Sequence, residues 1–212
     1  SPLQKDPSLT EISRSLLSGD IALDLDLIIP IKQPEKKLEV TGNIKLSNTA
    51  LKSSIKNIQL DNVEGGVNFT RYSVNSDLLS GSFHYNPVNL IISGDKSDPD
   101  NLPSIKIIGM ANEQFVADRL IEYFPALKSF EHYFRDRMLG EAEWSVSMTN
   151  VSGMEENKIV KKLVVESNLQ GIHMEFPYPV GKPRNQLRPI KVTSYLGSKQ
   201  NRNIQIKYDN IE

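Results

Sequence analysis

The side chains that most often do chemistry are few and scattered in this sequence. Its three histidines, His84, His132 and His173, lie in different segments and lack the spacing of a metal site. The motifs HExxH, GxSxG, GxxxxGKS/T and GxGxxG are absent. Catalysis needs an activated nucleophile or a matched acid–base pair, and the sequence offers neither. We therefore expect a protein that is not an enzyme and carries no metal or cofactor.

An acidic segment offers oxygen ligands that calcium could use, because Asp95, Asp98 and Asp100 follow one another closely. The spacing does not match an EF-hand loop, however, and Lys96 would repel a cation. Acidic turns that contain proline are common between strands. We interpret the segment as a solvated loop, which leaves the expectation of no metal site unchanged.

A basic turn is the second charged cluster. Lys182, Arg184 and Arg188 lie in and after the proline-rich segment 176–182, FPYPVGK. These cations could contact phosphate head groups, although a solvated turn is the simpler interpretation on composition alone. Lys182 and Arg184 are the candidates for head-group contact.

The composition excludes several classes of protein. With 25 basic and 26 acidic residues the formal net charge is −1, which gives no electrostatic case for binding nucleic acid. Cysteine is absent, so disulfides and thiolate sites are excluded. No apolar run reaches the roughly 18 residues of a membrane-spanning helix. Both ends look like cuts, and we expect the rest of the same chain to continue on both sides.

Apolar and polar residues alternate along most of the chain, as in half-buried β-strands. In 20–29, for example, Leu23 and Leu25 share the apolar side, and aspartates lie opposite. The turns are short and no βαβ alternation occurs, so the strands should pair antiparallel. Further strands are predicted at 37–47, 55–61, 63–71, 78–85, 88–94, 103–110, 141–150, 158–169, 171–176, 187–196 and 202–211.

The segment 112–139 is the exception, because its apolar residues recur at helical spacing. Asn112 is a candidate N-cap, and Pro125 should break or kink the segment. Gly140 should end it as the glycine that follows a helix. We predict two helices, or one kinked helix, in this segment.

The predicted fold class is therefore mainly β. It is a long curved antiparallel sheet, arranged as a groove or as a sandwich, with one short helical insertion around 112–139. Residues 1–19 form a poorly defined N-terminal segment, and 20–212 form a single β-rich domain. Within this domain, strands occupy 20–110 and 141–211.

Four glycines share a strand face with the apolar residues that follow them, namely Gly42, Gly65, Gly81 and Gly140. Glycine in a strand allows a bend, a bulge or the close approach of another group. An alternative interpretation is that these small residues make room for an acyl chain in a groove.

Two segments late in the chain carry a resemblance to a known family. Residues 165–172, VESNLQGI, and 176–182, FPYPVGK, are similar to the signature S-D/N-L-x-G … L-P-x-P-x-G-K. This signature belongs to the YhdP branch of the AsmA-like proteins. Phe176 stands where that family usually has leucine, which changes bulk but not apolar character.

Earlier passages resemble the same family in the same order. The residues YFPAL at 123–127 and LGEAEW at 139–144 resemble its helix followed by G-x-x-x-W. The residues from VEGGVNF at 63–69 to GSF at 81–83 resemble its preceding strands. The resemblance extends from about residue 37 to the end of the chain.

The resemblance implies a location and a function. Proteins of this family are anchored in the inner membrane of Gram-negative bacteria and extend through the periplasm. They fold as long curved β-sheets whose apolar inner surface forms a groove, and they are implicated in moving phospholipid towards the outer membrane. This chain would be a central, periplasmic section of such a protein, and phospholipid acyl chains would be its ligands.

Inward side chains of the strands would then line the lipid groove. The alternative is a structural or protein-interaction module of a cell-envelope protein, in which the strands form a closed sandwich. The candidate groove residues are Leu23, Leu25, Leu38, Val40, Ile44, Val67, Phe69, Phe83, Leu90 and Ile92.

Overall fold

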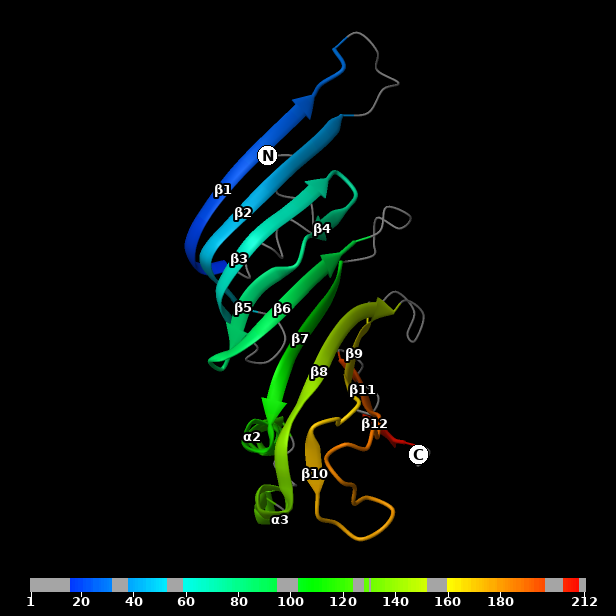
Figure 1. Ribbon diagram of the computed structural model, residues 1–212. Helices are drawn as coiled ribbons and strands as arrows, with labels where there is room; N and C mark the ends of the chain where they lie inside the picture. The colour runs from blue at the N-terminus through cyan, green and yellow to red at the C-terminus, as the bar shows by residue number, and fades with distance from the viewer. Residues whose placement is uncertain are drawn as a thin grey trace. The chain divides into compact units, whose positions relative to one another are not determined.

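The structure is a computed structural model that describes residues 16–31, 38–52, 59–94, 103–123, 128–129, 131–151, 160–196 and 204–209. Its strands form one twelve-stranded sheet, and every strand pair with a defined register is antiparallel. In the part of the chain that the structure describes, two short helices interrupt the succession of strands (Figure 1). The prediction of a mainly β, antiparallel fold with a helical insertion is therefore confirmed.

The first half of the chain contributes seven strands. They are β1 (Leu16–Ile28), β2 (Glu39–Lys52), β3 (Gln59–Thr70), β4 (Val74–Ser76), β5 (Leu79–Phe83), β6 (Asn86–Ser93) and β7 (Ser104–Asn112). The second half contains α2 (Glu113–Tyr123), α3 (Glu131–Arg137), β8 (Met138–Val151), β9 (Val160–Ser167), β10 (Ile172–Met174), β11 (Ile190–Leu196) and β12 (Ile204–Tyr208). The sheet order is β1-β2-β3-β4-β6-β7-β8-β9-β11-β12, with β5 paired to β3 and β6, and β10 paired to β8.

The chain divides into two compact units. The first unit comprises Ser1–Ile107 and Met148–Val151, and the second comprises Ile108–Ser147 and Ser152–Glu212. Strands β7 and β8 contribute residues to both units. The expectation of a single domain over 20–212 stays a prediction, and the predicted segment 1–19 lies largely outside the described residues, although β1 already begins at Leu16.

Two strand boundaries in the first unit differ from the sequence prediction. The strands expected at 55–61 and 63–71 are one strand, β3, whose pairing with β2 is irregular between Leu60 and Gly65. Asn62 in that stretch has a φ of 53°, so the strand is locally irregular there. Asparagine is also common in turns, which is why the sequence predicted a break at this point. The three-residue strand β4 was not predicted, because it is too short to show alternation.

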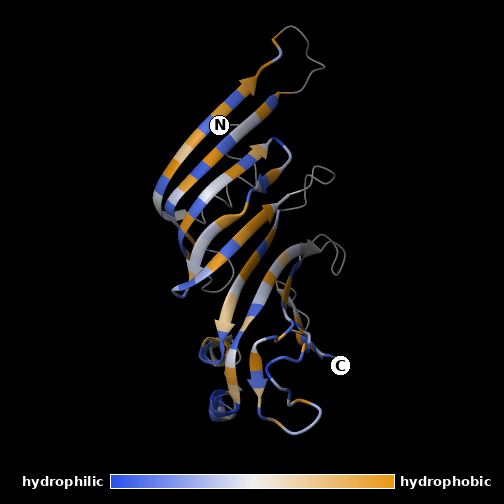
Figure 2. Ribbon diagram, in the orientation of Figure 1, coloured by the Kyte–Doolittle hydropathy of each residue, from blue (hydrophilic) through white to orange (hydrophobic). Residues whose placement is uncertain are grey.

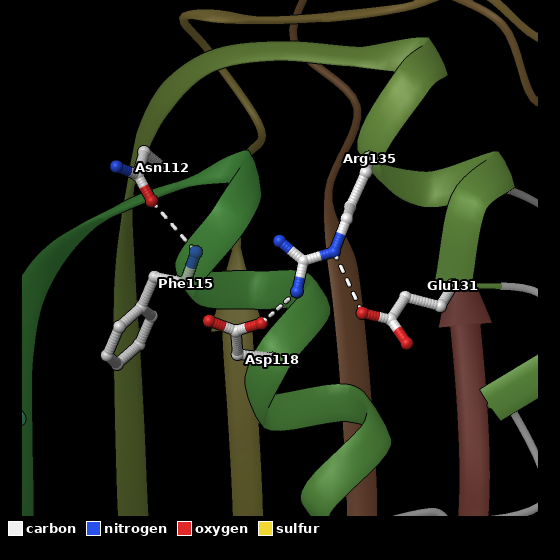
Figure 3. Close-up of polar contacts among 5 residues, drawn as sticks. All are labelled: Asn112, Phe115, Asp118, Glu131 and Arg135. Atoms are coloured by element: carbon white, nitrogen blue, oxygen red, sulfur yellow. Dashed lines mark hydrogen bonds and ion pairs between the residues drawn. The ribbon is translucent and has the colours of Figure 1, made fainter.

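Polar side chains cap the start of α2 and connect α2 to α3 (Figure 3). The side-chain oxygen of Asn112 accepts a hydrogen bond from the backbone N–H of Phe115 at 2.8 Å, which confirms Asn112 as the N-cap of α2. Arg135 of α3 donates to Glu131 on the same helix at 2.9 Å and to Asp118 on α2. These hydrogen bonds raise the pKa of Arg135, with the bond to Glu131 as the largest cause.

Gly140 does not follow a helix as a terminating glycine, so that prediction is wrong. It lies in β8, opposite Ile172 of β10, with a φ of 115°. A side chain at this position would place its Cβ 2.2 Å from the carbonyl oxygen of Gly171. The glycine therefore permits the close approach of two backbones. A helix end also favours glycine, so the residue type alone does not distinguish the two settings.

Candidate functional site

The strand register of the first unit sorts side chains onto two opposite faces. Residues directly opposite in an antiparallel pair lie on the same face, and Leu23, Ile44 and Val67 are opposite one another across β1, β2 and β3. In the neighbouring row, Asp24 lies opposite Asn43, which lies opposite Asn68. Figure 2 shows the resulting alternation of hydrophobic and hydrophilic residues along β1 and β2.

One face is thus apolar over β1 to β6, and we call it the apolar face. Ser80 and Ser82 of β5 pair with Glu64 and Asp61 of β3, which turns the alternate residues of β5 to the apolar side. Leu79 of β5 in turn lies opposite Leu90 of β6. The residues of the apolar face include Ile21, Leu23, Leu25, Leu27, Val40, Gly42, Ile44, Leu46, Val63, Gly65, Val67, Phe69, Val74, Leu79, Gly81, Phe83, Val88 and Leu90.

The structure brings the predicted groove residues of β1, β2, β3, β5 and β6 to this face. Leu38 lies just before β2, and Ile92 follows Leu90 at the alternating position of β6. Their exposure falls steeply across the sheet, however. Leu23 is 59% exposed, whereas Leu90 is 2% exposed. Leu23, Leu25 and Leu38 are exposed, Val40, Ile44 and Ile92 are half-buried, and Val67, Phe69, Phe83 and Leu90 are buried.

This gradient divides the apolar face into a buried part and an accessible part. Side chains around β3, β5 and β6 form a core, in which Val63 and Leu79 have no exposed surface. Strand β1 lies at one end of the sheet order, and its apolar residues Ile21, Leu23, Leu25 and Leu27 are between 43% and 59% exposed. The apolar residues of β1 are therefore exposed, whereas those around β3, β5 and β6 are packed in the core.

The glycines on the apolar face do not leave empty space. A Cβ at Gly42 would lie 2.4 Å from Cζ of Phe69, and one at Gly65 would lie 2.6 Å from Cδ2 of Leu79. At Gly81 the nearest atom is Cγ2 of Val63, at 3.2 Å. The interpretation that these three glycines make room for an acyl chain is therefore wrong. They make room for side chains of the neighbouring strand.

The opposite face of the same strands is polar. Asn43 donates a side-chain hydrogen bond to Asn68 at 2.8 Å, between β2 and β3. Asp24 and Asp26 of β1 are exposed. Since strands β1 to β3 have one apolar and one polar face, only one side of this part of the sheet offers surface for a hydrophobic ligand.

The basic turn of the second unit contains one buried and one exposed cation. Lys182 is 3% exposed, and its ammonium group donates to the carbonyl oxygens of Ile172 at 2.5 Å and Pro183 at 3.2 Å. Burial, together with the charge of Arg188, lowers the pKa of Lys182. Arg184 is exposed. Head-group contact stays a prediction, and Arg184 is the residue whose charge faces solvent.

Side chains elsewhere in the second unit donate hydrogen bonds to backbone carbonyls of the family-like segment FPYPVGK and stabilise its conformation. Tyr208 of β12 donates its hydroxyl to the carbonyl of Val180 at 2.6 Å, and Arg188 donates to the carbonyl of Pro179. Burial is the main cause that raises the pKa of Tyr208. A Cβ at Gly181 would lie 2.0 Å from the carbonyl oxygen of Phe176. These contacts give the form of this turn a structural reason in the second unit.

Two pockets in the second unit were not predicted from the sequence. The larger, of about 800 Å³, is lined by Arg184 and by three glutamates, Glu113, Glu141 and Glu143. Glu113 accepts a hydrogen bond from the backbone N–H of Gly140 at 3.1 Å. The smaller pocket has a volume of about 410 Å³, and its wall includes Glu143, Trp144, Glu166, Lys191, Lys207 and Asp209.

No group of three or more metal-ligating side chains lies close together among the residues that the structure describes. The acidic segment with Asp95, Asp98 and Asp100 lies outside those residues. In the described part of the chain, no helix has the length and apolar character to cross a membrane.

The fold and the apolar face define a class: an antiparallel β-sheet protein whose first unit presents an apolar surface on one side. Comparison with protein families gives the family itself. The family model described as YhdP protein matches residues 1–210, so the chain belongs to the YhdP family. This confirms the resemblance seen in the motifs and makes the chain a YhdP/AsmA-like cell-envelope protein. Neither curated proteins nor solved structures give a significant match.

Proposed function

We propose that this chain is a non-enzymatic, periplasmic segment of a phospholipid-transport protein, and that the apolar face of its first unit binds acyl chains. The observation that carries the proposal is the register of β1, β2 and β3. It aligns Leu23 with Ile44 and Val67 on one face, and places polar residues on the other. Membership of the YhdP family supports a function in lipid transport.

The row on β1 is the part of the face that an acyl chain would contact first. Ile21, Leu23, Leu25 and Leu27 are spaced by two residues, which corresponds to about 6–7 Å along a strand. Removal of apolar surface from water contributes about 25 cal/mol to the free energy of binding for each Å² buried. Both the lipid surface and the leucine surface that become buried count toward this sum. An extended hydrocarbon chain lying across this row would bury surface on both partners, whereas its head group would stay in water.

The direct test is the lipid that co-purifies with the protein. Leu23→Asp and Leu25→Asp place charges on the apolar face at exposed positions, so the fold should tolerate them and acyl binding should not. Ala22→Asp is the matched control, because Ala22 lies on the opposite face of the same strand. The full-length protein is purified from the envelope of a Gram-negative bacterium, and bound phospholipid is quantified by mass spectrometry.

We expect less phospholipid on the Leu23→Asp and Leu25→Asp variants than on the Ala22→Asp variant. Equal amounts of phospholipid on all three would contradict the proposal.

A contact with a partner protein is the alternative function. One observation favours it: Tyr178 is 91% exposed and Leu187 is 57% exposed, both in the turn region of the second unit. Exposed aromatic and aliphatic side chains on a long connection are typical of binding loops. If Tyr178→Ala releases a co-purifying protein while the phospholipid content stays unchanged and Leu23→Asp has no effect, the chain is an interaction module.

A further inference from the structure

Strand β1 lies at one end of the sheet order, so one of its two edges has no neighbouring strand in the described part of the chain (Figure 1). Every residue from Ser18 to Ile28 is exposed. In an edge strand, alternate residues direct their backbone N–H and C=O groups away from the sheet. The outer edge of β1 is therefore a row of hydrogen-bonding groups to which a further strand can pair.

The sequence of β1 lacks the features that normally protect such an edge. Natural edge strands are often short, or carry lysine, proline or a bulge. Strand β12, at the other end of the sheet order, has five residues and includes Lys207. Strand β1 has thirteen residues, LLSGDIALDLDLI, with neither lysine nor proline. Its pairing with β2 is irregular before Asp20 and regular from Asp20 to Ile28, so this regular segment has the properties of an edge that another strand covers.

The two faces of β1 define the sequence of a matching strand. On the apolar face, Leu23 and Leu25 are 59% and 43% exposed. On the polar face lie three aspartates, Asp20, Asp24 and Asp26. Side chains of neighbouring strands that share a face lie side by side. A strand that pairs with β1 should therefore carry apolar side chains on one face and basic side chains on the other.

The neighbouring strand does not neutralise these aspartates. The residues opposite them on β2 are uncharged, namely Ser47, Asn43 and Thr41. The same stretch of the polar face adds one carboxylate, Glu39, and one ammonium group, Lys45. Four carboxylates and one ammonium group give this part of the two strands a net charge of −3. Basic side chains on an added strand would be attracted to it.

Two other occupants match this edge poorly. Two copies of β1 side by side would bring aspartates against aspartates, which is destabilising. An acyl chain can cover Leu23 and Leu25, but it offers no hydrogen bonds to the backbone groups of the edge. A protein strand is therefore the occupant that satisfies both the backbone and the charges of β1.

We propose that the free edge of β1 binds an extended segment of a partner protein in which basic residues alternate with apolar residues. The segment adds a strand to the sheet through backbone hydrogen bonds. Its basic side chains lie beside Asp24 and Asp26, and its apolar side chains extend the apolar face. This interaction does not depend on the proposed function, because the segment binds the backbone edge of β1 whether or not the apolar face binds lipid.

Synthetic peptides and the full-length protein test the proposal. A short, fluorescently labelled peptide of alternating lysine and valine is titrated with the protein, and fluorescence anisotropy is recorded. In one control peptide glutamate replaces lysine, and in the other proline replaces the central valines, which prevents strand pairing. We expect the lysine peptide to bind about tenfold or more tightly than either control.

Variants of the aspartates test the charge preference. Asp24→Asn together with Asp26→Asn should weaken binding of the lysine peptide about fivefold, because two pairs of opposite charge are lost. Glu64→Gln is the matched control, since Glu64 is an exposed carboxylate on the polar face of β3. Asp24→Lys should raise the affinity for the glutamate peptide. Circular dichroism checks that the variants are folded.

Hydrogen exchange followed by mass spectrometry locates the binding. Segments of β1 should gain protection when the lysine peptide binds, and segments of β6 should not change. If β1 is already as protected as β2 in the full-length protein alone, the same chain covers this edge and the proposal is wrong. Absence of binding, equal binding of the glutamate peptide, equal weakening by Glu64→Gln or protection outside β1 would also overturn it.

Discussion

Replacing Leu79 with alanine should destabilise the first unit far more than the same replacement of Leu23, although both leucines lie on the apolar face. Leu79 has no exposed surface, whereas Leu23 is 59% exposed. Truncating a fully buried leucine costs about 2–5 kcal/mol, because transfer free energy is lost and a cavity remains. Full burial of a leucine side chain stabilises a protein by about 1.5–3 kcal/mol. Leu23 buries roughly two-fifths of its surface, so its truncation should cost about 1 kcal/mol.

Hydrogen exchange followed by mass spectrometry is the suitable assay, because it resolves the two units. Trp144 lies in the second unit, so its fluorescence does not report on this change. Peptides from β3 and β5 should lose protection in the Leu79→Ala variant, and should keep most of it in the Leu23→Ala variant. Urea unfolding followed by far-ultraviolet circular dichroism gives the corresponding free energies.

Equal losses of stability in the two variants would refute the reasoning. In that case β1 would pack as tightly as the centre of the sheet, and the apolar face would have no accessible part for a ligand. A large loss at Leu79 with a small loss at Leu23 separates the side chains that hold the fold from those that remain available for binding.

Three further replacements test individual contacts. Gly42→Ala should cost about 1–3 kcal/mol through a clash with the ring of Phe69, and adding Phe69→Leu should recover part of it, as measured by urea unfolding. Tyr208→Phe should cost about 0.5–1.5 kcal/mol, because the hydrogen bond to Val180 is lost. The pKa of Tyr208 is raised in the folded protein. The stability that its protonated hydroxyl provides is therefore complete below the ordinary tyrosine pKa of about 10, and is lost as the pH rises above it. Urea unfolding followed by Trp144 fluorescence should therefore show a midpoint that changes less with pH across this range in the Tyr208→Phe variant than in the unmodified chain. Asn112→Ala should cost α2 about 0.5–2 kcal/mol through loss of its N-cap, visible as faster hydrogen exchange in α2.

Local patterns in the sequence were sufficient to predict most of the strands. Alternation identified β1, β2 and the faces of Leu23 and Asp24, because the period of two is a direct consequence of strand geometry. Asn112 was recognisable as an N-cap since its role depends only on the next few residues. Gly140 was misassigned, because a helix end and a close backbone approach both require a residue without Cβ.

The distribution of burial could not be predicted from the same patterns. Leu23 and Leu90 occupy equivalent places in an alternating strand, yet their exposure differs because β1 lies at one end of the sheet order and β6 lies within it. Likewise, the smaller pocket joins Glu143 to Lys207, which are distant in the chain. Only the pairing of the strands brings such residues together, and pairing is not encoded in local spacing.

Photo-crosslinking at adjacent positions of β1 tests the central claim most directly. Benzoylphenylalanine is placed at Leu23, on the apolar face, or at Asp24, on the polar face, in the full-length protein in living cells. Adducts are then released and analysed for phospholipid by mass spectrometry. The account predicts phospholipid adducts at position 23 and none above background at position 24. Equal phospholipid adducts at both positions, or only protein adducts at position 23, would contradict it.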